Sequence, residues 1–315
     1  MTANRHRIAI KAVHQGDFRG FNPKAIMLII FNPVAGRRRA QRLWRVLDIM
    51  ATSGVRLEIV ETQYAGHATT LARAAAHGDG RKLVVAAGGD GTIAEVAAGL
   101  AGSDCKLGII PIGTANVLAH ELGLNFSPAG VAAALAFGRT VTLWPGAASG
   151  STGTRLFVQM LGAGFDAQVV GNLSLSLKRA IGRASYVLQS MRELVRYAFP
   201  PIAVSLDGVL SEAGSVIVSK GRLYAGRYLV APGCRPTDRG FSVVLFERPG
   251  PWQAALCGAA LPFDMISQMP GVRVVRADHV ELDCRAAPAQ TDGDPCANGR
   301  LTIDDAPGSI AVVVG

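Results

Sequence analysis

The feature that most constrains the fold is a predicted buried strand that runs straight into a glycine-rich turn and a helix. Five apolar residues, Leu83 to Ala87, precede the turn Gly88-Gly89-Asp90-Gly91-Thr92, and a helical pattern follows. An unbroken apolar run needs cover on both faces, which is typical of a parallel sheet in an α/β domain. Glycines let the backbone approach a ligand closely, and a helix N-terminus favours phosphate. The stretch predicts either a phosphate site with Asp90 beside it or a turn that only joins strand to helix.

Three more predicted strands end in polar or glycine-containing turns that lead into helices. These strands are expected over Ala25–Phe31, Val55–Glu61 and Lys106–Ile110. The turn residues that follow them are Asn32, Thr62 and Thr114. Because ligands of open α/β sheets bind outside the carboxyl ends of the strands, we expect these residues and Asp90 to converge on one crevice. The convergence favours the phosphate site over the plain turn.

The first predicted helix has apolar residues at helical spacing, which predicts a face that packs on the sheet. These residues are Leu43, Trp44, Leu47 and Met50. A last helix of this half is expected over residues 128–138.

The pattern changes after Leu143 to short alternating runs bounded by glycine, proline and aspartate, which predict an antiparallel β domain, a sandwich or flattened barrel. The runs are Leu156–Leu161, Ile202–Leu206, Ser215–Ser219, Gly226–Val230, Phe241–Phe246, Arg273–Arg276 and His279–Asp283. An amphipathic helical stretch, Leu177 to Ala198, either covers an open end of a sheet or lies on a membrane. The apolar stretch from Leu256 to Met269 is a candidate lip of a lipid pocket.

A chain of 315 residues fits two domains. We expect a basic flexible arm over residues 1–23, an α/β nucleotide-binding domain over 24–142 and a β-rich domain over 143–315. The arm is interpreted either as a solvated tail or as a segment attracted to anionic lipid headgroups.

The net charge of +9 and the pI near 9.7 indicate an anionic partner, such as nucleotide phosphates or an acidic membrane surface. The basic charge is not accompanied by any nucleic-acid-binding motif, so nucleic acid is not expected as a partner. Five scattered cysteines and the absence of an apolar span of about 20 residues favour a cytoplasmic protein without a transmembrane helix.

Four motifs in order resemble the diacylglycerol kinase catalytic family, which includes bacterial soluble lipid kinases, sphingosine kinases and ceramide kinases. They are Asn-Pro-Val-Ala-Gly at 32–36, Gly-Gly-Asp-Gly-Thr at 88–92, Pro-Ile-Gly-Thr-Ala-Asn at 111–116 and Gly-Ala-Gly-Phe-Asp-Ala at 162–167. The resemblance implies an N-terminal α/β domain similar to phosphofructokinases and NAD kinases, a C-terminal antiparallel β-sandwich that helps hold a lipid, and an active site between them.

The resemblance also implies ATP and Mg²⁺ as cofactors, with Asp90 organising Mg²⁺ and the γ-phosphate. The residues that match ATP-binding positions are Asn32, Pro33, Val34, Ala35, Gly36, Thr62, Gly88, Gly89, Asp90, Gly91, Thr92, Ile93, Ala94, Glu95 and Thr114. Val117 stands where many members carry aspartate, which leaves more of the magnesium network to Asp90 and Asp166.

The segment Gln290 to Pro295 resembles the Asp-Gly-Glu segment of the family, so Asp294 matches the catalytic acid with a carboxylate one methylene shorter. A base here would take the proton of the lipid hydroxyl, typically contributing about 10²–10⁴-fold. Asp294 then acts directly or through water, or Asp292 takes its place; a plain Asp-Gly turn is the alternative.

The loop Arg235 to Phe241 matches a structural magnesium site of some bacterial members. That site would use the carboxylate of Asp238 and the backbone carbonyls of Arg235 and Gly240. The usual Asp-Gly pair is Asp238-Arg239 in this chain, so a loop without metal is the alternative.

The sequence therefore predicts an ATP- and Mg²⁺-dependent kinase of a diacylglycerol-like or sphingoid lipid, associated peripherally with the inner face of the cell membrane. A monomer and a homodimer are both open. Alternatives are ceramide or sphingosine as substrate, another kinase on the same fold, and a regulator without activity. The second motif of NAD kinases, Thr-Pro-Thr-Gly-Ser-Thr-Ala-Tyr, is missing, and so are the P-loop and protein-kinase signatures.

Overall fold

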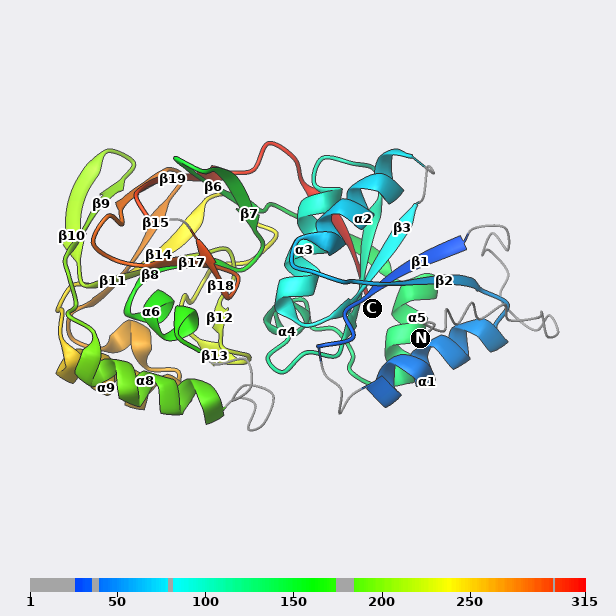
Figure 1. Cartoon of the computed structure of the whole chain (residues 1–315), viewed down its shortest axis with the longest axis horizontal. Helices are drawn as coiled ribbons and strands as arrows, with labels where there is room; N and C mark the ends of the chain where they lie inside the picture. The colour runs from blue at the N-terminus through cyan, green and yellow to red at the C-terminus, as the bar shows by residue number, and fades with distance from the viewer. Residues whose placement is uncertain (1–25, 36–39, 79–81, 174–183, 297) are drawn as a thin grey trace, which may run out of the picture.

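In the computed structural model, the described residues are 26–35, 40–78, 82–173, 184–296 and 298–315. The predicted basic arm, the nucleotide-binding candidate Gly36 and the first part of the predicted amphipathic helix lie outside these ranges. Figure 1 shows two lobes side by side, an α/β lobe that carries the first strands and a β-rich lobe. The predicted fold class is confirmed.

The first lobe is built on a six-stranded sheet in the order β2-β1-β3-β4-β20-β5. Its strands are β1 (Ile26–Phe31), β2 (Arg56–Glu61), β3 (Leu83–Gly88), β4 (Lys106–Pro111), β5 (Arg139–Leu143) and β20 (Ile310–Val314). All neighbours are parallel except β20 and β5, which are antiparallel. The four predicted strand-to-helix turns all occur.

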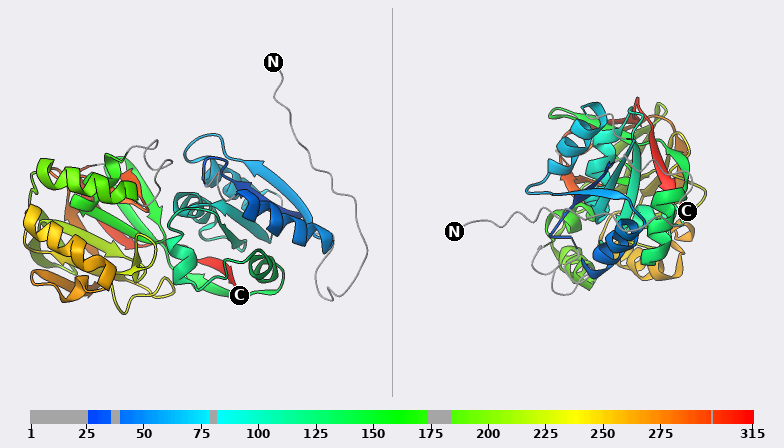
Figure 2. Two further views of the ribbon diagram at one scale, coloured as in Figure 1. Left: turned by 90° about the horizontal axis from the view of Figure 1, so that it is seen from below. Right: turned by 90° about the vertical axis from the view of Figure 1, so that its right-hand side faces the viewer.

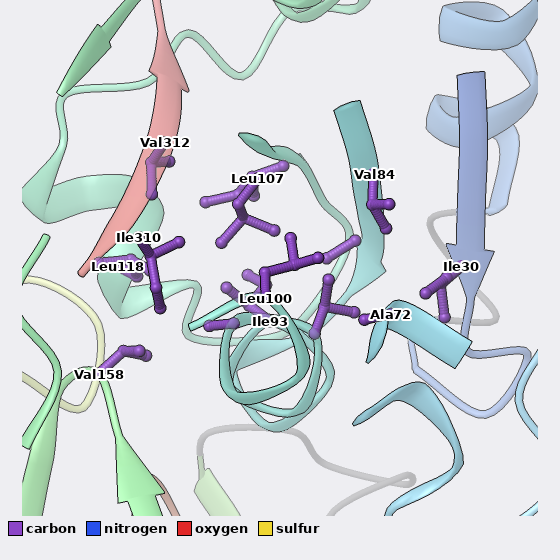
Figure 3. Packing of buried hydrophobic residues seen from close by; sticks show 14 of the residues in the cluster. Ile30, Ala72, Val84, Ile93, Leu100, Leu107, Leu118, Val158, Ile310 and Val312 are labelled. Atoms are coloured by element: carbon purple, nitrogen blue, oxygen red, sulfur yellow. The ribbon is translucent and has the colours of Figure 1, made fainter. Parts of the chain in front are cut away.

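Helices cover both faces of this sheet, as the unbroken apolar strands require. α1 (Ala40–Thr52) and α5 (Pro128–Phe137) lie on one face, α2 (His67–His77) and α3 (Asp90–Leu100) on the other, and the short α4 (Val117–Glu121) follows β4. In Figure 3, Ile93 and Leu100 of α3 point at Val84 and Leu107 of the sheet. Trp44 was expected in the core but is 46% exposed.

The second lobe packs two antiparallel six-stranded sheets on each other, in the orders β10-β9-β16-β19-β6-β7 and β15-β14-β11-β8-β17-β18. The strands of the first of these sheets are β6 (Gly146–Gly150), β7 (Gly153–Phe157), β9 (Ile202–Leu206), β10 (Val209–Ala213), β16 (Val280–Asp283) and β19 (Arg300–Asp305). Those of the second are β8 (Met160–Gly164), β11 (Ser215–Ser219), β14 (Phe241–Phe246), β15 (Val272–Ala277), β17 (Ala289–Thr291) and β18 (Asp294–Cys296). One buried cluster draws from both sheets, which makes the lobe a sandwich.

Helices lie on the outside of this sandwich. They are α6 (Phe165–Gly171), α8 (Ala184–Arg196) and α9 (Pro251–Ala260), followed by the short 3₁₀ helices η2 (Leu261–Phe263) and η3 (Ile266–Gln268). Of the predicted strand Gly226–Val230, only β13 (Tyr228–Leu229) forms, and it pairs with β12 (Leu223–Tyr224) outside the two sheets. No helix in the described part of the chain is long and apolar enough to cross a membrane.

The chain crosses between the lobes twice, first after β5, close to the predicted boundary at residue 143, and again after β19. After β19 the chain returns to the first lobe, where β20 lies between β4 and β5, so the range 143–315 is not one structural unit. Ile310 and Val312 of β20 belong to the core of the first lobe (Figure 3). Val158, between β7 and β8, also reaches into that core and joins the two lobes there.

Candidate active site

The carboxyl ends of four parallel strands lie at one edge of the first sheet, and backbone hydrogen bonds join the turns that follow them. The Asn32 amide donates to the Ala87 carbonyl at 3.0 Å, and the Thr62 amide donates to the Phe31 carbonyl at 2.8 Å. The Gly113 amide donates to the Gly88 carbonyl at 3.2 Å. The predicted candidates from all four turns therefore gather at this edge, while Thr114 is exposed there.

Two of these turns touch backbone against backbone. A Cβ atom added to Gly113 would lie 2.4 Å from the Cα atom of Gly89, a separation that real atoms do not adopt. A Cβ atom on Gly88 would lie 2.4 Å from the Cβ atom of Thr92, whose side chain is 6% exposed. Glycine is thus required at Gly88 and Gly113, because a methyl group at either position would overlap its neighbours.

Asn32 and Thr92 connect the first turn to the glycine-rich turn. The Asn32 side-chain amide donates to the Thr92 Oγ1 atom at 3.0 Å. Its Oδ1 atom accepts the amides of Val34 at 3.0 Å and of Ala35 at 3.3 Å, which fixes the turn after β1. The Asn-Pro-Val-Ala motif therefore shapes a rigid loop directly beside Gly88 to Thr92.

Asp90 is partly buried at the start of α3 and points at the start of α4. Its Oδ1 atom accepts the Val117 amide at 2.6 Å. Burial raises the pKa of Asp90, while backbone hydrogen bonds from residues at the start of α4 oppose the shift. Next to it, Asn116 adopts a left-handed conformation with φ of 50°, and its Oδ1 atom is buried without a hydrogen-bond partner among the described residues. The partly buried carboxyl group of Asp90 and the buried Oδ1 atom of Asn116 are therefore two oxygen groups in these turns.

Asp292 is held by the backbone of the segment between β7 and β8. Its Oδ2 atom accepts the Val158 amide at 2.7 Å, and its Oδ1 atom accepts the amides of Gln159 at 2.9 Å and Met160 at 3.0 Å. Burial and, to a smaller extent, the nearby Asp90 carboxylate raise the pKa of Asp292, the three amides lower it, and the net pKa is about 6. Because Val158 is also part of the first core, these bonds fix Asp292 relative to the glycine-rich turn.

Asp294 lies two residues further on and faces the same turn. A Cβ atom added to Gly91 would be 3.8 Å from its Oδ2 atom. Its side chain is 51% exposed and forms an ion pair of 3.1 Å with the guanidinium of Arg155, which also donates to the Pro295 carbonyl at 2.9 Å. The second lobe therefore brings an accessible carboxylate to the glycine-rich turn of the first. Arg155 carries no motif, and sequence reasoning missed it.

Two other predicted ligands serve the packing of the lobes. Glu95 accepts the Ala68 amide at 3.1 Å and so stabilises the first turn of α2. Asp166 is partly buried, its Oδ2 atom accepts the Gln290 side-chain amide at 2.8 Å, and its Oδ1 atom accepts the Tyr224 hydroxyl. Burial raises the pKa of Asp166, and these two hydrogen bonds lower it. Within the described ranges, no three acidic, histidine or cysteine side chains form a metal-binding cluster.

The loop over 235–240 does not fit the structural magnesium site that the resemblance implies. The Gly240 carbonyl accepts the Lys220 ammonium at 2.9 Å, and the Arg235 carbonyl accepts the Asp238 amide at 2.9 Å. Lys220 is fully buried and also forms an ion pair of 2.7 Å with Asp305. Burial lowers the pKa of Lys220, and the Asp305 carboxylate opposes that shift. The predicted metal ligands Arg235 and Gly240 are therefore engaged by protein donors.

Helix α8 turns its polar side toward the protein. Gln189 and Glu193 are 5% and 3% exposed, and Gln189 and Gln168 donate their side-chain amides to Glu193 at 2.6 and 3.0 Å. The exposed apolar residues of this helix are Val187, Leu188, Met191 and Val195. With 3.6 residues per turn, these four side chains fall within an arc of about 100°.

Neighbouring elements extend this apolar surface, which we call the α8–α9 face. α9 packs beside α8, as Figures 1 and 2 show. Trp252 and Phe263 are 77% and 74% exposed. Leu256 and Met265 are exposed as well. The basic residues Arg192 and Arg196 of α8 are exposed beside the apolar arc.

The lobes and the turns that meet between them define a kinase catalytic domain of one family. The chain matches the diacylglycerol kinase catalytic domain over residues 26–146 and the YegS C-terminal NAD kinase beta sandwich-like domain over residues 159–314. It therefore belongs to the diacylglycerol kinase catalytic-domain family and is an enzyme of the kinase class.

Individual relatives agree with this assignment. A probable lipid kinase YegS-like of Pseudomonas aeruginosa PAO1 is 26% identical over 295 residues, covering 89% of this chain and 87% of its own. A diacylglycerol kinase of Bacillus subtilis strain 168 is 29% identical over 228 residues, covering 70% and 73%. The crystal structure of a putative diacylglycerol kinase from Bacillus anthracis superposes with a TM-score of 0.76 at 20% identity, over 96% of this chain and 99% of that one.

Proposed function

We propose that this protein transfers the γ-phosphate of ATP, with Mg²⁺, to a hydroxyl of a diacylglycerol-like lipid. One observation carries the proposal: the half-exposed Asp294 of the second lobe faces the glycine-rich turn of the first, which contains the partly buried Asp90. A phosphoryl-transfer site needs donors for phosphate oxygens on one side and a base for the attacking hydroxyl on the other. The names of the relatives, lipid kinase and diacylglycerol kinase, support a lipid acceptor.

The nucleotide would lie at the turn over Gly88 to Thr92. α3 begins at Asp90 within this turn, and the backbone N–H groups in the first turn of a helix favour phosphate. Asp90 and the Oδ1 atom of Asn116 are oxygen ligands, which Mg²⁺ prefers, and the second of them has no other partner among the described residues. Asp90 would hold the nucleotide-bound ion, and bound Mg²⁺ would neutralise charge on the phosphate oxygens.

Asp294 would accept the proton of the lipid hydroxyl. It is accessible to a substrate, and the ion pair with Arg155 limits the positions that its carboxylate adopts. Asp292 is less suited as the base because three backbone amides occupy its oxygens. We assign Asp292 the role of a positioning residue that anchors the Asp-Gly turn before Asp294.

Transfer of ³²P from [γ-³²P]ATP to diacylglycerol, monoacylglycerol, ceramide and sphingosine in mixed micelles tests this function. We expect labelled product with diacylglycerol at the highest rate. If only ceramide or sphingosine were labelled, the acceptor would be a sphingoid lipid and not a diacylglycerol-like one. Without product from any of the four lipids, and with nucleotide binding intact in an equilibrium assay, the protein would be a nucleotide-binding regulator.

We also propose that the α8–α9 face docks on an anionic bilayer, where the lipid substrate is found. Apolar side chains on the outer surface of a helix whose inner surface is polar need a nonpolar partner. Arg192 and Arg196 at the edge of the apolar arc match the charge of anionic headgroups, as in helices that lie in the membrane interface. A peripheral enzyme with this geometry would withdraw substrate directly from the membrane surface.

Sedimentation with phosphatidylglycerol vesicles tests this docking surface. Burying an apolar side chain contributes about 1.5–3 kcal/mol, so the double variant M191E/V195E should bind these vesicles about 100-fold more weakly. The matched control V209E/L210E changes two exposed apolar residues of β10, outside the face, and should sediment like the wild type. Equal sedimentation of M191E/V195E and the wild type would exclude this face as the docking surface.

A further inference from the structure

Lys220 is a fully buried lysine with three oxygen partners. It follows β11, and its Nζ atom donates to the Asp238 carbonyl at 3.1 Å, the Gly240 carbonyl at 2.9 Å and the Asp305 Oδ1 atom at 2.7 Å. Lysine is rarely buried without such partners. The three acceptors match the three N–H bonds of an ammonium group, whereas a neutral amine has only two.

The loop over 235–240 offers its carbonyls to protein donors rather than to an ion. Besides the two that accept Lys220, the Pro236 carbonyl accepts the Trp144 amide at 3.2 Å, and the Arg239 carbonyl accepts the Arg276 guanidinium at 2.6 Å. The Arg235 carbonyl accepts the amide of Asp238 within the loop. Five of the six carbonyls of the loop therefore accept an N–H donor. The Lys220 ammonium lies between two of these carbonyls and the Asp305 carboxylate.

This charge lies at the point where the chain crosses between the lobes. Asp305 is the last residue of β19, directly before the return to β20, and its Oδ2 atom accepts the Gly240 amide at 3.0 Å. Trp144 belongs to the other crossing, and its ring lies 3.7 Å from the guanidinium carbon of Arg239. The loop over 235–240 thus contacts both crossings, and Lys220 joins it to one of them.

We infer that the Lys220 ammonium serves as a built-in cation that fixes the loop over 235–240 to the crossing between the lobes, in place of a structural metal ion. The ammonium satisfies two carbonyls and a carboxylate, the donor set that a hard cation would otherwise use. The loop therefore keeps its shape without Mg²⁺ or Ca²⁺. This inference is independent of the proposed lipid kinase function.

The thermal unfolding midpoint of the nucleotide-free protein tests it, in EDTA, in MgCl₂ and in CaCl₂. We expect the wild-type Tm to agree within about 1 °C across the three conditions, because no metal stabilises only the folded state. The D238N variant, which lacks the carboxylate of the implied metal site, should behave identically. A wild-type gain of several degrees with either cation that is absent from D238N would overturn the inference.

The K220M variant tests the charge itself, since methionine keeps an unbranched side chain and loses the ammonium. Removing one partner of a buried ion pair is strongly destabilising, and we expect the Tm to fall by roughly 10 °C. The control K106M removes an exposed lysine at the start of β4 and should leave the Tm unchanged. A K220M variant with the wild-type Tm would contradict the inference. If K220M yields no folded protein, the metal titrations of the wild type and D238N decide.

Discussion

The carboxyl group of Asp292 makes the stability of this protein depend on pH in a direction that is unusual for aspartate. Its pKa is raised from 3.8 to about 6 in the folded state, first by burial and further by the neighbouring Asp90 carboxylate. The folded state therefore holds this proton at pH values where the unfolded state has lost it. Its contribution to the free energy of unfolding is present below about pH 4 and is lost as the pH rises to about 6. Two pKa units correspond to about 3 kcal/mol.

Titration of the Asp292 ¹³Cγ resonance in aspartate-labelled protein measures this pKa, and the resonance is assigned by its absence from D292N. We expect a midpoint near pH 6 in the wild type. In D90N the midpoint should be lower, because one raising cause is removed. The free energy of unfolding of the wild type, relative to that of D292N, should fall by about 3 kcal/mol between pH 4 and pH 6.5. A midpoint at or below pH 4, or the same pH dependence in D292N, would refute the reasoning.

Three further predictions follow from the contacts at the site. G113A should lower the free energy of unfolding by about 1–3 kcal/mol, because the added methyl group overlaps Gly89. The control G258A, in the open face of α9, should keep the wild-type stability, and differential scanning fluorimetry compares the two variants. D294A should lower kcat by about 10²–10⁴-fold and leave the ATP KM unchanged in steady-state assays. A change in KM alone would refute the assignment of Asp294 as the general base. E95A should cost about 1 kcal/mol of stability with kcat retained, and a large loss of kcat at full stability would instead place Glu95 at the nucleotide.

The first lobe could be predicted from sequence because its signals are local. The apolar run before Gly88, the glycines of the turn and the helix after it all specify one strand-turn-helix unit, and the unit occurs in β3 and α3. The position of β20 could not be predicted in this way. The residues Ile310 to Val314 form a good strand in either lobe, and only long-range packing places them between β4 and β5. The predicted range 143–315 therefore includes a last strand that packs in the first lobe.

The site was predictable only in part. The motifs singled out Asp90 and Asp294, and the fold places Asp294 against the turn that contains Asp90. That Glu95 stabilises α2 and that Arg155 pairs with Asp294 could not be read from motifs, because these contacts depend on which side chains the fold brings together. Lys220 carried no signal, since a lysine in a sequence is expected at the surface. Trp44 shows the opposite case, because helical spacing alone did not separate it from its buried neighbours Leu43 and Leu47.

The most direct test of the proposed function compares wild type and D90N in one assay, the initial rate of ³²P transfer from ATP to diacylglycerol in mixed micelles. Asparagine keeps the oxygen that accepts the Val117 amide, so D90N should fold with an unchanged circular dichroism spectrum. We predict labelled lipid from the wild type and at least about 100-fold less from D90N. Near-wild-type turnover of D90N would contradict the assignment of the glycine-rich turn as the phosphoryl-transfer site.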